Sequence, residues 1–216
     1  RLARQIVDPG FIILSLLLTY LVMMIAQLIE EDRDRRVMAH NLLIEREDNA
    51  RMSGELNAAR EIQMGILPDP ESIQGLPDDL EVHAFLEPAR EVGGDLYDLF
   101  MLDEHRLFFV IGDVSGKGVP ASLFMALSKA LCKSAALRSD ASVAELMTTA
   151  NVEISRENPA YMFVTAVAGI IDARTGEIEY CNAGHDAPLV VAPGQATVSV
   201  DSDGGPPLCV IDDFDY

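Results

Sequence analysis

Two glycine-flanked aspartates are the residues of this sequence with the clearest capacity for chemistry. Asp95 follows Gly93-Gly94 and opens an apolar run, and Asp113 follows Gly112 and closes the next apolar run. If a hairpin joins the two runs as antiparallel neighbours, both carboxylates lie at the same end of a sheet. Carboxylates held this close repel one another unless a proton or a cation lies between them. An oxygen-ligated Mg²⁺ or Mn²⁺ site is therefore one interpretation, and a pair of ordinary turn aspartates is the other.

A layered domain over residues 68–216 is expected to position these aspartates. Apolar runs bounded by turn residues predict strands over 80–87, 96–102, 107–111, 162–171, 177–182, 188–191 and 197–200. Two helices separate the early strands from the late ones. The first begins at Gly118-Val119-Pro120, and the second begins at Ser142 with Glu145 three residues on, which is a capping box. This order of elements predicts a largely antiparallel α+β domain.

Residues 9–29 carry no charge and consist mainly of Leu, Ile, Val and Met. At the helical rise of about 1.5 Å per residue, roughly 20 residues cross a hydrocarbon core of about 30 Å. A buried core helix would show a polar face, and a signal peptide would end in small residues rather than in Glu30-Glu31-Asp32-Arg33. We therefore expect a transmembrane helix over 9–29, with residues 1–8 ending an upstream segment. More arginines follow the span than precede it, which places the C-terminal side in the cytoplasm, beneath the cell membrane.

Residues 30–67 carry dense charge of both signs, which predicts one long helical linker. A heptad repeat fits this linker, with Leu42, Asn49 and Leu56 along one seam. Such a seam would pair two copies of the chain as a coiled coil, and the central Asn would fix their register. The acidic Glu45 on the same seam weakens the fit. A solvated helical connector is therefore the alternative to a homodimer.

Composition excludes several classes of protein. The formal net charge of -19 argues against a nucleic-acid-binding protein, because no basic patch is present to neutralise phosphates. The three cysteines, Cys132, Cys181 and Cys209, are scattered without metal-ligand or redox spacing, which indicates reduced thiols. A phosphorylated substrate would need metal ions or local basic groups to offset the repulsion from so acidic a chain.

Two nucleotide-binding signatures match this sequence only in part. Three residues rather than four separate Gly112 from Gly116, and Gly118 follows Lys117 where a phosphate-binding loop needs Ser or Thr. The run Gly93-Gly94-Asp95 begins like the GGDEF signature of diguanylate cyclases but departs from it at the next residue. We expect no nucleotide binding.

Five short motifs lie in order along residues 58–191. They are Ala59-Arg60-Glu61-Ile62-Gln63, Glu91-Val92-Gly93-Gly94-Asp95-Leu96-Tyr97-Asp98, Gly112-Asp113-Val114-Ser115-Gly116-Lys117-Gly118-Val119-Pro120-Ala121, Phe163-Val164-Thr165-Ala166 and Asn182-Ala183-Gly184-His185. In this order they closely resemble the SpoIIE/RsbU-type phosphatases, a bacterial branch of the PPM, or protein phosphatase 2C, superfamily. The resemblance implies a two-layer antiparallel β-sandwich flanked by helices. It also implies two Mn²⁺ or Mg²⁺ ions, with Asp95, Asp113 and the backbone carbonyl of Val114 as ligands.

The activity implied by the resemblance is that of a metal-dependent serine/threonine phosphoprotein phosphatase in bacterial signal transduction. In such enzymes metal-activated water attacks phosphoserine or phosphothreonine directly, so no side chain is the nucleophile. The resemblance also implies that the helix before the domain transmits regulation and that an anti-sigma factor antagonist is a candidate substrate. A non-catalytic, membrane-tethered module that binds a phosphoprotein is the alternative.

Other polar residues of the domain have alternative interpretations. Lys117 either contacts the substrate phosphate or is a solvated charge, and His185 either shapes its loop or transfers a proton. Asp98 is interpreted as structural, because an odd separation from Asp95 turns it to the opposite face of a strand.

The remaining metal-ligand aspartates of the family belong to a C-terminal Asp-Gly-containing strand and the end of the domain. The C-terminal aspartates of this chain do not lie in that motif, and they are Asp201, Asp203, Asp212, Asp213 and Asp215. We expect the sequence to be cut at both ends and, by itself, to bind metal poorly and to have little or no activity.

Overall fold

The computed structural model describes residues 9–138, 141–200 and 204–216. Its elements in chain order are α1 (Pro9–Ile66), the 3₁₀ turn η1 (Pro70–Ser72), β1 (Leu96–Met101), β2 (Arg106–Val114), α2 (Val119–Arg138), α3 (Val143–Arg156), β3 (Val164–Asp172), β4 (Glu177–Ala183), β5 (Leu189–Val190) and β6 (Val198–Ser199). The upstream segment expected at 1–8, as well as Asp201 and Asp203, lie outside the described residues. The chain divides into two compact units, Arg1–Glu55 and Leu56–Tyr216.

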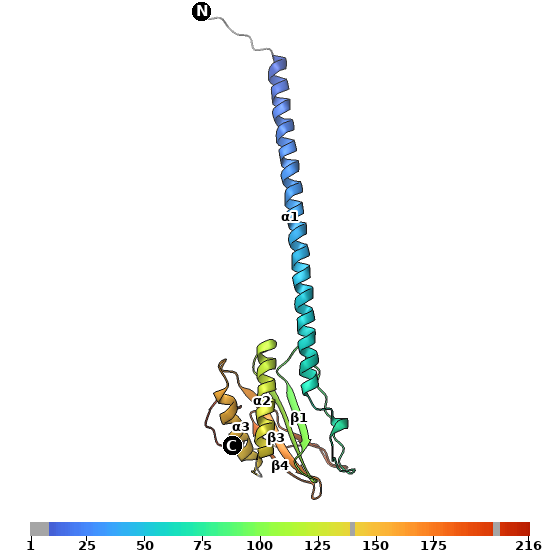
Figure 1. Cartoon of the computed structure of the whole chain (residues 1–216), viewed down its shortest axis with the longest axis vertical. Coiled ribbons are helices and arrows are strands. Elements are labelled where there is room, and N and C mark those ends of the chain that lie inside the picture. The colour runs from blue at the N-terminus through green and yellow to red at the C-terminus, as the bar shows by residue number, and fades with distance from the viewer. Residues whose placement is uncertain (1–8, 139–140, 201–203) are drawn as a thin grey trace, which may run out of the picture. The chain divides into compact units, whose positions relative to one another are not determined.

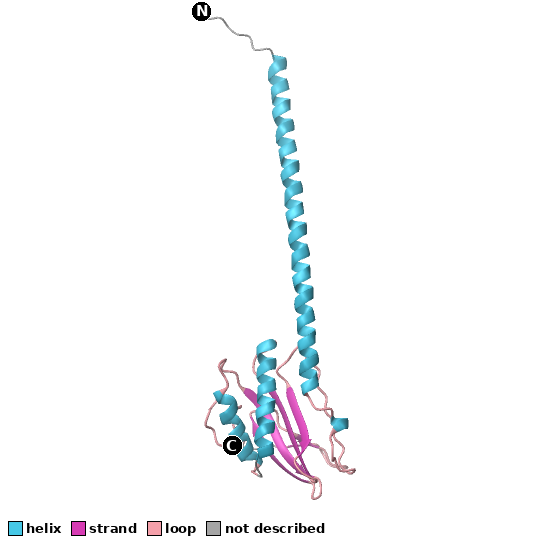
Figure 2. Cartoon of the chain, in the orientation of Figure 1, coloured by secondary structure: helices cyan, strands magenta, loops and turns pink. Residues whose placement is uncertain are grey.

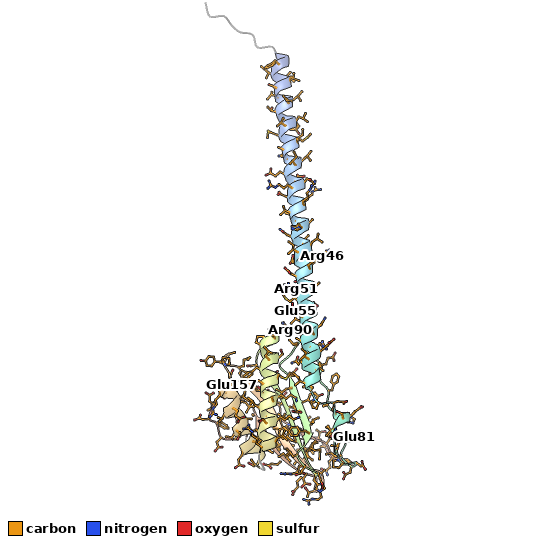
Figure 3. The ribbon with its side chains drawn as sticks, viewed as in Figure 1. Arg46, Arg51, Glu55, Glu81, Arg90 and Glu157 are labelled. Atoms are coloured by element: carbon orange, nitrogen blue, oxygen red, sulfur yellow. The ribbon has the colours of Figure 1, made fainter. Side chains whose placement is uncertain are left out.

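Helix α1 runs without interruption for 58 residues, so the expected apolar span and charged linker form one continuous helix (Figure 2). It contains an 18-residue window of mean hydropathy 2.5 of which 0% is buried, and it is long and apolar enough to cross a membrane. Charged side chains project from the following turns, including Arg46, Arg51 and Glu55, which Figure 3 labels. Ion pairs such as Arg36–Asp32, with 2.6 Å between Nη2 and Oδ2, support this part of the helix.

Strands β1 to β4 form one antiparallel sheet in the order β1-β2-β3-β4, and β5 pairs with β6 in a second, two-stranded sheet. Tight turns join β1 to β2 and β3 to β4, whereas α2 and α3 lie between β2 and β3 in the chain. In the turn between β1 and β2, Asp103 Oδ1 accepts hydrogen bonds from the backbone N–H groups of His105 and Arg106 at 2.8 and 2.9 Å. The predicted α+β antiparallel architecture is confirmed, and six of the seven predicted strands are present with ends shifted by a few residues.

Helices α2 and α3 lie side by side and cover one face of the large sheet (Figure 1). Buried residues of α2, α3 and the facing sides of the strands form the core, and they include Phe108, Val110, Met125, Met147 and Ile154. The predicted capping box starts α3, because Ser142 Oγ accepts from the Glu145 N–H and the Glu145 carboxylate accepts from the Ser142 N–H. Because α2 and α3 both pack on one face of the sheet, they do not cover the other face, which carries Ile111 and Asp113.

The prediction of a strand over residues 80–87 is wrong. Side chains along this segment do alternate between half-buried and exposed, as they do in a strand. However, none of the strand pairings in the described part of the chain includes it. A strand requires backbone hydrogen bonds to a neighbouring strand, so the alternation predicted the burial pattern but not membership of a sheet.

Candidate active site

Asp95 and Asp113 meet at one end of the β1–β2 hairpin, as their spacing predicted. Leu96 pairs with Gly112, so continuing the register by one residue sets Asp95 opposite Asp113. Burial raises the pKa of the Asp113 carboxyl, and the charge of Asp95 and a hydrogen bond between the two side chains raise it further. The interaction with His185 and the hydrogen bond from the N–H of Val114 lower this pKa. The raised pKa of Asp113 thus reflects the repulsion between two carboxylates held close together, which a bound cation would offset.

Gly94 allows the two ends of the hairpin to approach closely. A Cβ at this position would lie 2.7 Å from the carbonyl oxygen of Val114 and 3.1 Å from Asp113 Oδ1. The backbone N–H of Val114 donates to the carbonyl of Gly94 at 3.3 Å. The two aspartates and the Val114 carbonyl, the three groups expected to bind metal, therefore belong to one small cluster of oxygen atoms. Hard oxygen donors of this kind fit Mg²⁺ or Mn²⁺.

His185 lies beside this cluster and is held by hydrogen bonds to residues of β3 and β4. Asn182 brackets its backbone, with Nδ2 donating to the His185 carbonyl at 3.0 Å and Oδ1 accepting from the His185 N–H at 2.8 Å. Thr165 Oγ1 lies 2.9 Å from the ring Nδ1 and donates to the carbonyl of Asp113 at 3.4 Å. Gly184 precedes His185 with φ of +68°, a conformation that glycine adopts without strain. Thr165 was part of a motif in the sequence, but no role was predicted for it.

A cavity of about 670 Å³ opens beside the cluster, on the sheet face opposite to the helices. Its lining is largely apolar and includes segment 80–87, Leu99, Phe109, Ile111, Asp95 and His185. The polar groups of the candidate site therefore lie at the edge of an apolar hollow, an arrangement typical of ligand-binding sites.

Asp98 points away from this cavity, as predicted from its odd separation from Asp95. Its Oδ2 accepts a hydrogen bond from Lys129 Nζ of α2 at 2.9 Å, and the two side chains are 1% and 8% exposed. Lys133 Nζ lies 3.8 Å from the same oxygen and 4.5 Å from the centroid of the Phe100 ring. Asp98 is thus structural, but its partner was not predicted. The sequence did contain a signal for this partner, because Lys129 lies on the same helix face as the apolar residues Met125 and Cys132.

The last turns of α1 bond directly to the loop that carries Asp95. Gln63 is buried, and its Nε2 donates to the Gly93 carbonyl at 2.7 Å while its Oε1 accepts from the Gly93 N–H at 3.1 Å. Tyr97 adds a hydrogen bond from its hydroxyl to the carbonyl of Pro68 at 3.0 Å. The end of the linker helix and the aspartate loop are therefore parts of one hydrogen-bonded structure. This contact was not predicted.

Several candidate residues are not among those that line the cavity. Lys117 is exposed in a loop between Gly116 and Gly118, whose φ angles are +96° and +72°. The C-terminal segment packs on α3, where Asn151 Nδ2 donates to the carbonyls of Ile211 and Asp212. In residues 9–138, 141–200 and 204–216, no three His, Cys, Asp or Glu side chains converge as a metal-ligand group.

Comparison with known proteins identifies similar sequences. The family model described as Stage II sporulation protein E (SpoIIE) matches residues 103–216. Protein IcfG of Synechocystis sp. is 32% identical over 165 residues, which cover 63% of this chain and 25% of that protein. Phosphoserine phosphatase RsbP of Bacillus subtilis is 27% identical over 165 residues, covering 75% of this chain and 40% of that protein. The chain thus spans less than half the length of these relatives.

Two solved structures have a similar fold. The RsbU and RsbW domains of Rv1364c from Mycobacterium tuberculosis match with a TM-score of 0.52 at 28% identity, over 60% of this chain and 36% of that one. The SiaA-PP2C domain of Pseudomonas aeruginosa matches with a TM-score of 0.59 at 20% identity, over 74% of this chain and 63% of that one. The second likeness supports the fold alone.

Proposed function

This chain belongs to the SpoIIE family of PP2C-type signalling phosphatases, and we propose that it acts as a metal-dependent serine/threonine phosphoprotein phosphatase. The observation that carries the proposal is the meeting of Asp95 and Asp113 at the edge of the cavity. The charge of Asp95 raises the pKa of Asp113, and a simple turn does not require two carboxylates at this distance. They are useful where a cation is to be held.

Asp95, Asp113 and the Val114 carbonyl are the groups that would hold two Mn²⁺ or Mg²⁺ ions in this proposal. Bound there, such cations supply activated water at neutral pH and offset the charge of the phosphoryl oxygens. Gly94 leaves the space beside the oxygen cluster free of a side chain, and the largely apolar cavity lies next to the cluster. Lys117, exposed on its glycine-flanked loop, is the proposed basic contact for the phosphoryl group.

The function is tested by adding Mn²⁺ to the full-length protein and following the hydrolysis of p-nitrophenyl phosphate and of a phosphoserine peptide. We expect turnover of both that is abolished by EDTA and restored by Mn²⁺. Binding of the phosphopeptide without turnover would instead support a non-catalytic module. The C-terminal Asp212, Asp213 and Asp215 are not expected to contribute, since their segment packs on α3.

We further propose the organisation that links this site to a signal. Residues 1–8 would end an upstream segment, 9–29 would span the bacterial cell membrane, 30–67 would form the linker and 68–216 the phosphatase domain in the cytoplasm. The hydropathy of α1 supports the span. The substrate class is a phosphorylated regulatory protein of the anti-sigma antagonist type, since relatives of this chain include RsbP and RsbU phosphoserine phosphatases.

Homodimerisation through the linker is the proposed route of regulation. Leu42 on the heptad seam is 55% exposed and Leu43 beside it is 57% exposed, so in one copy of the helix both are available for contact. Leu42→Asp should abolish dimer formation by the detergent-solubilised protein, because it buries a charge in the seam. Leu43→Asp, which lies off the seam, is the matched control and should leave the dimer intact. Light scattering after size-exclusion chromatography reads both, and equal behaviour of the two variants would rule out this coil.

A further inference from the structure

The loop between α3 and β3 carries an exposed aromatic side chain in a strained backbone conformation. Tyr161 is 94% exposed and has a φ of +52°, in the left-handed region that disfavours residues with a side chain. Among the described residues, Cys209 is the only other residue apart from glycine with a positive φ. A ring that is almost fully exposed contributes little burial to offset this strain. Backbone strain of this kind is concentrated at functional sites.

Hydrogen bonds on both sides of Tyr161 hold the loop in this shape. Asn158 Nδ2 donates to the Met162 carbonyl at 2.6 Å, and Asn158 Oδ1 accepts from the Met162 N–H at 2.9 Å. The N–H of Tyr161 itself donates to the Asn158 carbonyl at 3.4 Å. Met162 packs against the hydrophobic core of the domain. The backbone of Tyr161 is therefore fixed between anchored neighbours while its ring is presented to solvent.

This loop is joined to the strand end that carries Asp113. Val114 pairs with Val164 at the end of the β2–β3 ladder. The next two residues, Ser115 and Phe163, are joined by two hydrogen bonds, from the Ser115 N–H to the Phe163 carbonyl at 2.8 Å and from the Phe163 N–H to Ser115 Oγ at 2.9 Å. Side chains that are directly opposite, or two residues apart on a strand, share a face of the sheet. Phe163, which is 42% exposed, therefore lies on the same face as Asp113.

The loop is uncharged although the chain is strongly acidic. Residues 158–171 contain no Asp, Glu, Lys or Arg, whereas the chain as a whole has a formal net charge of -19. A phosphorylated protein carries added negative charge at its modified residue, so an uncharged surface beside the site repels it less than an acidic one. A second copy of this chain would bring the same negative charge and would compete with the substrate for the strand end that carries Asp113. The phosphorylated substrate is therefore the occupant that this surface fits.

We propose that Tyr161 and Phe163 form an aromatic docking surface for the protein part of the phosphorylated substrate, and that this surface binds an aliphatic side chain next to the phosphoserine. The proposal rests on the phosphatase function proposed above and names a feature of the substrate that the site selects. Tyrosine is frequent among the residues that contribute most to the affinity of interfaces, because its ring offers a large contact area at a low entropy cost. A loop already held by hydrogen bonds lowers that cost further.

The selectivity is tested on the full-length protein with Mn²⁺ and two phosphoserine peptides of equal length and charge. One peptide has Leu on both sides of the phosphoserine, and the other has Gly. We expect kcat/KM of the wild type to be about tenfold higher for the Leu peptide, mainly through KM, which corresponds to about 1.4 kcal/mol of binding free energy. Tyr161→Ala should lower this ratio to about three or less, and Tyr161→Phe should retain it. Equal kcat/KM values in the wild type, or an unchanged ratio in Tyr161→Ala, would overturn the proposal.

Thermal unfolding of the variants separates docking from a role in the fold. Glycine adopts a positive φ without strain, so Tyr161→Gly should have a melting temperature equal to or above that of the wild type while losing the preference for the Leu peptide. Ile178→Ser is the control, because Ile178 is another exposed apolar residue, 54% exposed, and pairs with Ile171 toward the other end of the sheet. This control should keep the peptide preference. A melting temperature of Tyr161→Gly well below that of the wild type would assign the residue to the fold and contradict the docking role.

These experiments separate the failure of this inference from that of the proposed function. If the wild type hydrolyses neither p-nitrophenyl phosphate nor either peptide with Mn²⁺, the phosphatase function fails. Fluorescence anisotropy of the two labelled peptides with Mn²⁺ then tests the surface by itself. Tighter binding of the Leu peptide that is lost in Tyr161→Ala supports the docking surface, and equal binding of the two peptides overturns it.

Discussion

Replacing Lys129 with Met should lower the free energy of unfolding by about 3–5 kcal/mol, because the substitution leaves the Asp98 carboxylate buried without its main partner. The two side chains are 8% and 1% exposed, and 2.9 Å separates Nζ from Oδ2. Methionine fills a similar volume, so the cost arises from the charge and not from a cavity. Asp98 keeps one local hydrogen bond, from the N–H of Leu99 at 3.0 Å, which compensates little. Urea unfolding followed by far-UV circular dichroism measures the change.

The neighbouring lysine supplies the matched control. Lys133 lies 3.8 Å from the same carboxylate, but its side chain is 41% exposed and can be solvated. Lys133→Met should therefore cost about 1 kcal/mol or less, including its contact with the Phe100 ring. In the double variant Asp98→Leu with Lys129→Met, no charge remains buried, so most of the lost stability should return. If Lys129→Met and Lys133→Met cost the same, the buried pair does not have the stabilising role assigned to it.

Most elements of the fold could be predicted because their signals are local. The capping box of Ser142 and Glu145 acts within a few residues and is present as predicted, and the hydrogen bonds of the turn at Asp103 are equally local. Segment 80–87 shows where local signals end. The alternation of apolar and polar residues predicts which side chains are half-buried. Whether the segment joins a sheet depends instead on a partner strand elsewhere in the chain, which this local pattern does not reveal.

The same distinction applies to the candidate site. Asp95 and Asp113 could be placed together because one hairpin connects them, so their register follows from the turn. The contacts that were missed all join residues distant in sequence. Gln63 to Gly93 spans 30 positions, Lys129 to Asp98 spans 31 and Thr165 to His185 spans 20. Side-chain bonds over such separations leave no periodic pattern in the sequence and require the folded structure to be seen.

Asp113→Asn should have two opposite effects, one on function and one on stability. In the full-length protein with Mn²⁺, we expect hydrolysis of p-nitrophenyl phosphate to fall at least about 100-fold, more than the loss of an outer partner of a metal ligand typically costs. An amide is neutral and a poorer ligand for a hard cation than a carboxylate. The melting temperature of the wild type should rise with Mn²⁺, as for any ligand that binds only the folded state, and that of the variant should not.

The metal-free variant, in contrast, should be more stable than the wild type at neutral pH. Burial first, and then the Asp95 charge, raise the pKa of Asp113 in the folded state. A group with a raised folded-state pKa stabilises the fold below its unfolded pKa, and this stabilisation is lost as the pH rises through the folded pKa. At neutral pH the ionised Asp113 therefore destabilises the metal-free domain. Asparagine removes that penalty, so thermal unfolding in EDTA should show a higher melting temperature for the variant and a weaker dependence on pH in the acidic range.

Asp103→Asn provides the control of opposite sign. Hydrogen bonds from the backbone N–H of His105, and then from the Arg106 side chain and N–H, lower the pKa of Asp103 to about 2. Its ionised form stabilises the turn at neutral pH, and that stabilisation is lost as the pH falls through the folded pKa. Asp103→Asn should thus lower the melting temperature and leave the Mn²⁺-dependent activity intact. A charge that destabilises the metal-free domain but is required for activity has a functional role, whereas a charge that stabilises the domain has a structural one. If Asp113→Asn instead lowered the metal-free melting temperature and retained activity, Asp113 would be a turn residue like Asp103, and the metal-dependent function would lose its principal support.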